Sequence, residues 1–190
     1  DQRLYYLKKL KIKGSLLDIG CGTGLFLQTA RNYGYDVSGI DVSQTALKFA
    51  RESFKLNVSD EKVEDLISQN KKYDFVTLWH VLEHFANPKD ELEKIKQLLN
   101  PGGILLIEVP NLNSIKFKLS KSKWKGGNHP LYHRSFFTDK TLKETLKLAG
   151  FNKARRLRVS YELPGKSVIY NSSKDLFNLF AMDAFLDFAA

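Results

Sequence analysis

The sequence stretch that decides the fold is Leu16-Leu17-Asp18-Ile19-Gly20-Cys21-Gly22-Thr23-Gly24. An apolar run ends in an acid, three glycines follow at alternate positions, and residues 25–30 then resume at helical spacing. Because glycine has no Cβ, such a turn lets a ligand approach backbone amides and the positive end of the following helix. The stretch therefore predicts a buried strand, a ligand-binding glycine turn and a helix.

The same alternation of strand and helix continues along the chain. Apolar runs predict strands, and segments with apolar residues at helical spacing separate them. The strands are expected at residues 15–19, 36–41, 55–58, 73–79 and 104–109. This pattern predicts the α/β class, with a doubly wound, mostly parallel sheet and helices on both faces. An antiparallel pair at residues 154–161 and 167–170 would bring the sheet to seven strands.

The length favours one domain over residues 1–190. Residues 111–135 show no period and are expected to form an excursion that covers the substrate. Residues 174–189 are rich in phenylalanine and predict an apolar helix, which would pack on the domain or form the interface of a homodimer.

The formal net charge of +9 is unevenly distributed. Residues 113–174 contain fifteen Lys or Arg and three acids, so this region carries +12 and the rest of the chain −3. A basic region of this kind suits an anionic acceptor, although lysine-rich surfaces are as often simply solvated.

A single cysteine excludes an internal disulfide framework and a cysteine-based zinc cluster, and we expect no metal. No apolar run reaches the roughly 18 residues of a membrane span. The first residues lack the apolar core of a signal peptide, so we expect a cytoplasmic protein. Because the chain begins at Asp1 and not at Met, the question whether it is a fragment stays open.

The residues around the glycine turn narrow the choice of ligand. A phosphate-binding loop requires Gly-Lys-Ser/Thr, which does not follow here. In the dinucleotide fingerprint the third glycine comes after two intervening residues, whereas Gly24 follows Gly22 after only one. A carboxylate at Asp18 would repel a pyrophosphate but suits a ligand with an ammonium group. Asp41, at the end of the second predicted strand, can accept hydrogen bonds from both hydroxyls of a ribose.

Four motifs in this order resemble those of the class I S-adenosylmethionine-dependent methyltransferases. They are LDIGCGTG at residues 17–24, GIDVS at 39–43, YDFVTLWHVLEH at 73–84 and LLNPGGILLI at 98–107. The Leu-Glu-His element, Pro110-Asn111, Trp124 and residues 133–142 are similar to the small-molecule branch known as type 12 or type 23, which includes O-methyltransferases of the ubiquinone pathway. The resemblance covers most of the chain.

This resemblance implies S-adenosylmethionine as the cofactor, with S-adenosylhomocysteine as its product. The backbone of Gly20, Cys21 and Gly22 would contact the methionine part, and Gly24 completes the turn. The other implied cofactor-binding residues are Asp18, Asp41 at the ribose, Val42 beside the adenine, Val63 through its backbone, and Trp79 and His80 at the fourth strand end.

Methyl transfer needs an aligned acceptor and, for an alcohol, a general base. Histidine is the natural base because its pKa is about 6.5 in water. His133 lies in the excursion that would cover the acceptor, and it matches a histidine that recurs in the family. His84 follows Glu83, with a structural or catalytic role. The expected reaction is in-line methyl transfer to a small molecule, most simply at oxygen.

Two alternatives stay open at this point. The basic region also suits RNA, so methylation of a ribose or another RNA group is not excluded. A protein of this fold that binds the cofactor without catalysis is the second alternative. Base methylation by the best-known routes is disfavoured, because the fourth strand lacks the Asn/Asp-Pro-Pro-aromatic motif and Cys21 lies in the cofactor turn.

Overall fold

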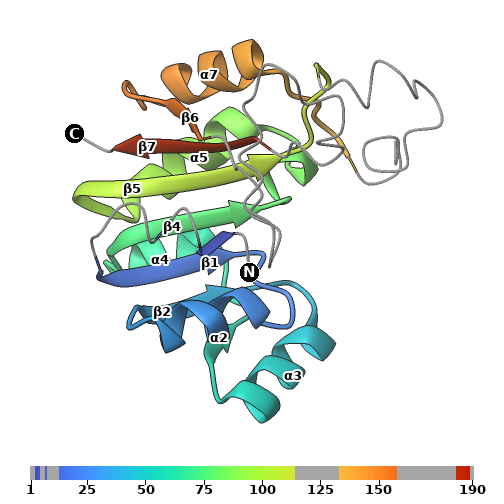
Figure 1. Ribbon diagram of the computed structural model, residues 1–190, viewed down its shortest axis with the longest axis vertical. Helices are drawn as coiled ribbons and strands as arrows, with labels where there is room; N and C mark the ends of the chain where they lie inside the picture. The colour runs from blue at the N-terminus through green and yellow to red at the C-terminus, as the bar shows by residue number, and fades with distance from the viewer. Residues whose placement is uncertain (1–2, 5–6, 8–12, 114–132, 158–182, 189–190) are drawn as a thin grey trace, which may run out of the picture.

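The computed structural model describes residues 3–4, 7, 13–113, 133–157 and 183–188 (Figure 1). Five parallel strands form the body of one sheet, in the order β3-β2-β1-β4-β5. They are β1 (Ser15–Ile19), β2 (Asp36–Ile40), β3 (Asn57–Ser59), β4 (Tyr73–Trp79) and β5 (Leu99–Val109). The prediction of a doubly wound, mostly parallel sheet is confirmed. The order places the carboxyl ends of β1, β2 and β4 side by side.

Helices cover both faces of this sheet (Figure 1). The helical segments are α2 (Leu25–Asn32), α3 (Gln44–Phe54), α4 (Val63–Ser68), the short 3₁₀ turn η1 (Leu82–His84), α5 (Pro88–Gln97) and α7 (Asp139–Leu148). Helices α2 and α3 pack on one face, and α4, α5 and α7 pack on the other. Helix α2 begins directly after the glycine turn, over the residues 25–30 whose helical spacing predicted a helix there.

Alternate residues of each central strand supply the two cores. Leu16 and Phe75 face α2 and α3, whereas Leu17 and Val76 face α4, α5 and α7. All four side chains are 0–1% exposed. Strands buried on both faces read as continuous apolar runs, which is why the central strands could be recognised from the sequence.

The predicted apolar helix at 174–189 is wrong where the structure describes it. Residues Asp183–Phe188 form a strand, β7, which pairs antiparallel with β5 from Ile104↔Phe188 to Val109↔Asp183. The edge of β5 presents unpaired main-chain groups, and a strand satisfies them where a helix cannot. Aromatic residues also favour strands. A homodimer interface on such a helix therefore has no basis in the described residues.

The predicted antiparallel pair also differs from the structure. Strand β6 is described over Arg155–Leu157, and its partner is β7. Residues 158–182, which include the expected strand at 167–170, lie outside the described residues, as does most of the expected excursion at 111–135. The segment that returns to the sheet thus comes from further along the chain than the local pattern indicated.

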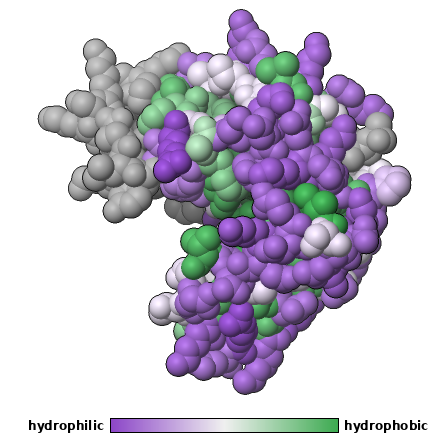
Figure 2. All heavy atoms as spheres, turned by 180° about the vertical axis from the view of Figure 1, so that it is seen from behind, coloured by the Kyte–Doolittle hydropathy of each residue, from purple (hydrophilic) through white to green (hydrophobic). Residues whose placement is uncertain are grey.

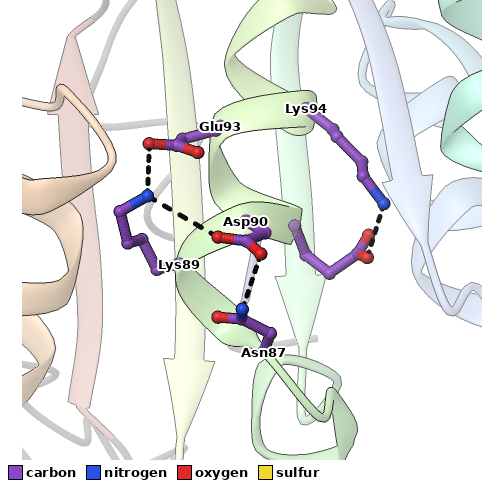
Figure 3. A network of polar contacts seen from close by, with 6 residues as sticks. Asn87, Lys89, Asp90, Glu93 and Lys94 are labelled. Atoms are coloured by element: carbon purple, nitrogen blue, oxygen red, sulfur yellow. Dashed lines mark hydrogen bonds and ion pairs between the residues drawn. The ribbon is translucent and has the colours of Figure 1, made fainter.

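The outer surface of α5 shows how the helices meet solvent (Figure 3). Asn87 donates a hydrogen bond to Asp90 at the start of the helix, and Lys89 pairs with Glu93 one turn later at 2.7 Å. Figure 2 shows that hydrophilic residues cover most of the opposite view of the molecule, with hydrophobic residues in small separate groups. Exposed ion pairs such as Lys89–Glu93 contribute little to stability.

Gly24 provides a test of the packing beneath the glycine turn. An alanine there would place its Cβ 2.4 Å from Leu56 Cδ1 and 3.1 Å from Ala50 Cβ, at a φ of +76°. Gly102 has the same φ but open space around it. We expect Gly24→Ala to lose about 1 kcal/mol more unfolding free energy in urea than Gly102→Ala, because only the first overpacks a core. Equal losses would contradict this packing.

Candidate cofactor and acceptor site

The glycine turn begins where β1 ends and is fixed against the end of β2. The amides of Gly20 and Cys21 donate to the carbonyl of Ile40 at 2.8 and 3.1 Å, and the Gly24 amide donates to the Cys21 carbonyl at 3.0 Å. The φ angles of Gly20, Gly22 and Gly24 are +74°, +53° and +76°. Three left-handed residues in five explain why glycine is required at alternate positions.

Only Gly22 of these three glycines faces open space. A Cβ at Gly22 would meet no atom within 4 Å, whereas one at Gly20 would lie 2.4 Å from Val81 Cγ2. Glycine is therefore needed at positions 20 and 24 because side chains of the protein itself pack against them. Gly22 is the position at which the turn leaves room for a ligand to approach the backbone.

Asp41 connects this open position to the end of β2. Its carboxylate accepts hydrogen bonds from the Gly22 amide and from the Ser43 amide, both at 2.8 Å. The Asp41 amide donates to the Ser59 carbonyl at the end of β3. A carboxylate offers about four acceptor positions, so two remain for a ligand. Val42, next to it, is 95% exposed and presents an apolar surface at the same edge.

Asp18 is buried beside this turn. It accepts a hydrogen bond from Thr77 Oγ1 at 2.6 Å, across the pairing of β1 with β4. Burial raises the pKa of Asp18 to about 7, against the opposing effects of the Thr77 hydrogen bond and the charge of Arg3. A buried carboxyl that titrates near neutral pH is typical of a functional site.

Arg3 and Trp79 form a layer that the sequence did not indicate as a unit. The Arg3 guanidinium lies 5.4 Å from the centre of the Trp79 ring, and Trp79 packs edge-on against Phe26 at 5.1 Å. Trp79 is buried, and its Nε1 has no hydrogen-bond partner among the described residues. An unpaired buried donor beside a cation provides two groups that suit an anionic ligand atom.

His80 follows Trp79 and lies between two carboxyl groups. Its φ is +59°, which is unusual for a residue with a side chain. Its Nδ1 lies 3.2 Å from Glu83 Oε1 and its Nε2 lies 3.8 Å from Glu108 Oε1. Backbone strain of this kind persists where the surrounding contacts hold it, often at functional sites.

Glu108 was missed by the sequence reasoning. It is the next-to-last residue of the apolar strand β5, is buried, and its Oε2 lies 3.7 Å from Arg3 Nε. Burial raises the pKa of Glu108, while His80 and Arg3 lower it and Glu83 raises it. The available signal was an acid inside an apolar strand, as at Asp18.

The two predicted catalytic histidines are brought together from distant parts of the chain. The rings of His84 and His133 have centres 4.9 Å apart and meet edge to face. His84 is exposed and His133 is half-buried. His84 belongs to η1, just beyond the carboxyl end of β4, and His133 packs against it; the catalytic roles of both stay predictions.

The side chains of two further predicted cofactor-binding residues, Cys21 and Val63, are buried in the protein. The Cys21 side chain is buried against Gly39, and burial together with Asp18 and Asp41 raises the pKa of its thiol to about 12. This thiol is not a nucleophile at neutral pH. The Val63 side chain is buried on the other face of the sheet, in the core with α4, so only its backbone is available to a ligand.

Comparison with known proteins identifies the family. The family model described as "Methyltransferase domain" matches residues 1–155. The chain therefore belongs to the methyltransferase domain family. It is a class I S-adenosylmethionine-dependent methyltransferase. This confirms the resemblance drawn from the four sequence motifs.

Curated relatives include ubiquinone biosynthesis O-methyltransferases. The chain is 36% identical over 114 residues to that of Glaesserella parasuis, covering 55% of this chain and 48% of the relative. It is 32% identical over 147 residues to that of Dinoroseobacter shibae, covering 71% and 58%. The chain thus spans about half the length of the curated relatives it matches.

Solved structures show the same fold. A S-adenosylmethionine-dependent methyltransferase from Archaeoglobus fulgidus superposes with a TM-score of 0.71 at 21% identity, covering 99% of this chain and 94% of the other. The plantazolicin methyltransferase BpumL, solved with S-adenosylhomocysteine, gives 0.67 at 23% identity, covering 100% and 81%. No helix in the described part of this chain is long and apolar enough to cross a membrane.

The raised pKa of Asp18 gives a pH-dependent prediction. The unfolded chain releases this proton near pH 3.8 and the native chain near 7, so ionised Asp18 destabilises the native state above that range. At pH 8 we expect the free energy of unfolding to be higher for Asp18→Asn than for the wild type. This excess should shrink by about 1.4 kcal/mol per pH unit between pH 7 and 5.

Urea unfolding of both proteins at several pH values measures this difference. Asparagine keeps an oxygen that accepts the Thr77 hydrogen bond, so the variant removes the charge and little else. A difference that stays constant from pH 8 to 5 would show that Asp18 is ionised throughout.

Proposed function

We propose that this protein transfers a methyl group from S-adenosylmethionine to an oxygen atom of a small molecule. The observation that carries the proposal is the meeting of open Gly22, half-buried Asp41 and buried Asp18 at one edge of the sheet. Each of these groups complements a different part of the cofactor.

The nucleoside end of the cofactor fits the end of β2. The Asp41 carboxylate keeps two acceptor positions beyond its bonds to the Gly22 and Ser43 amides, which suits the two ribose hydroxyls. The exposed side chain of Val42 offers an apolar surface to the adenine ring. The open space at Gly22 lets the chain of the cofactor pass close to the backbone.

The amino acid end of the cofactor fits the groups between β1, β4 and the N-terminal residues. Ionised Asp18 would pair with the ammonium group. The Arg3 guanidinium and the unpaired Trp79 Nε1 would bind the carboxylate. An ammonium close to Asp18 favours the ionised carboxyl, so cofactor binding and deprotonation of Asp18 reinforce each other.

S-Adenosylmethionine supplies a methyl group that its sulfonium already activates. The protein's task is then to hold an acceptor oxygen in line with that methyl group and to exclude water. In this proposal His84 and His133, whose rings meet edge to face, line the acceptor side of the site. Oxygen as the acceptor atom rests on the names of the curated relatives and on the availability of a histidine base.

We further propose an anionic acceptor, on the basis of the lysines at residues 116–125 in the excursion. Their placement lies outside the described residues, so this part of the proposal rests on the sequence alone. A carboxylated or phosphorylated acceptor would be attracted by this charge, and the attraction would weaken with added salt.

Replacement of Asp41 tests the cofactor assignment. We expect Asp41→Asn to raise the dissociation constant of S-adenosylhomocysteine at least tenfold, because the charged acceptor of the ribose hydroxyls is lost. Isothermal titration calorimetry measures this constant directly. The matched control is Asp36→Asn, an exposed acid at the other end of β2, which should leave the constant unchanged. Unchanged affinity in Asp41→Asn would contradict the assignment.

A further inference from the structure

Three of the four histidines of the chain lie around the carboxyl group of Glu83. His80 Nδ1 is 3.2 Å from Glu83 Oε1. A ring nitrogen of His84, one of His133 and a carboxylate oxygen of Glu83 all lie within 4.8 Å of one another. The sequence reasoning treated Glu83 only as part of a motif and gave it no role.

The Glu83 carboxyl group is deeply buried and only partly satisfied. The residue is 1% exposed, and its Oε2 atom has no hydrogen-bond partner among the described residues. Burial of a carboxylate oxygen without a hydrogen-bond partner is costly, so this atom calls for an explanation in the structure. His84 and His133, each with a ring nitrogen within 4.8 Å of a carboxylate oxygen of Glu83, are the two predicted catalytic histidines.

The backbone of Glu83 also fixes the segment that carries His133. The Glu83 carbonyl accepts hydrogen bonds from the amides of Arg134 and Ser135, at 2.9 and 3.0 Å. Ser135 Oγ donates to the carbonyl of Phe85 at 3.5 Å. One residue therefore anchors the loop of His133 through its main chain and faces the same histidine with its carboxylate.

We propose that Glu83 is the positioning residue of a histidine base, with its carboxylate orienting the ring of His133 and stabilising that ring once it is protonated. This inference rests on the proposed function. The acceptor O–H bond breaks, its proton goes to a ring nitrogen of His133, and its electron pair remains on oxygen. That oxygen forms the new bond to the methyl carbon, and the electron pair of the broken sulfur–carbon bond stays on sulfur.

The other charges near Glu83 define how this pair should titrate. His80 Nδ1 contacts Glu83 Oε1, Glu108 lies beyond His80, and Arg3 lies beyond Glu108. His84 packs against the His133 ring, and the exposed Arg134 is adjacent in the chain. Glu83 is the carboxylate nearest to His133 in this set, so its removal should leave the protonated ring of His133 less stable.

The test compares Glu83→Gln with the wild type in complex with S-adenosylhomocysteine. Nuclear magnetic resonance of histidine-labelled protein follows the ring of His133, assigned with His133→Gln. We expect the pH at which His133 takes up its proton to fall by about one unit in Glu83→Gln. We also expect turnover with catechol and 3,4-dihydroxybenzoate as probes to fall at least tenfold, with S-adenosylhomocysteine affinity within twofold of the wild type.

Two further variants keep the test interpretable. Glu93→Gln on α5 is the matched control, since Glu93 is exposed and pairs with Lys89, and it should alter neither quantity. Glu83→Asp keeps the negative charge. Compared with Glu83→Gln, it should regain part of the turnover, and the pH at which His133 takes up its proton should lie close to the wild-type value. If Glu83→Gln fails to fold, Glu83→Asp becomes the test: its shorter side chain moves the carboxylate away from His133 and should lower the pH at which His133 takes up its proton, by less than about one unit, and an unchanged titration would contradict the inference.

Three results would overturn the inference. The first is an unchanged His133 titration in a folded Glu83→Gln protein. The second is full turnover in His133→Ala. The third is loss of wild-type turnover on treatment with EDTA that zinc or magnesium restores, because the three side chains would then hold a cation. Failure of the wild type to methylate either probe would instead count against the proposed acceptor class and leaves the His133 titration as the deciding result.

Discussion

The hydrogen bond from the Gly22 amide to the Asp41 carboxylate is the contact on which the candidate site depends. It joins the turn after β1 to the end of β2, and it requires a left-handed residue at Gly22. Parallel strands make this contact available, because they bring their carboxyl ends to one edge of the sheet. The sheet order, the two apolar cores and the close packing at Gly20 and Gly24 all maintain that edge.

The charges at this edge fall into two groups with different surroundings. Asp41 is half-buried and held by backbone amides, which suits neutral hydroxyl donors. Asp18 and Glu108 are buried, which raises the pKa of each carboxyl, and the charge of Arg3 lowers both. A ligand that carries both an ammonium group and a sulfonium would relieve the burial of these acids.

Much of the fold could be predicted from the sequence, because its signals are local. Continuous apolar runs marked β1, β4 and β5, and helical spacing after the glycine turn marked α2. Asp18, Gly22 and Asp41 could be related to one another because each follows or ends a strand in a predictable order. Strand β7 could not, since its phenylalanine-rich sequence suits a helix or a strand, and only the open edge of β5 decides between them. Arg3, Glu108 and Glu83 were missed because their roles depend on neighbours distant in the sequence.

A crystal structure of the protein with S-adenosylhomocysteine tests the central claim most directly. The account predicts both ribose hydroxyls on the Asp41 carboxylate, the ammonium group beside Asp18 and the carboxylate beside Arg3, with the sulfur facing the histidine side of the edge. A complex with the ribose away from Asp41, or with the cofactor bound at another edge of the sheet, would contradict it.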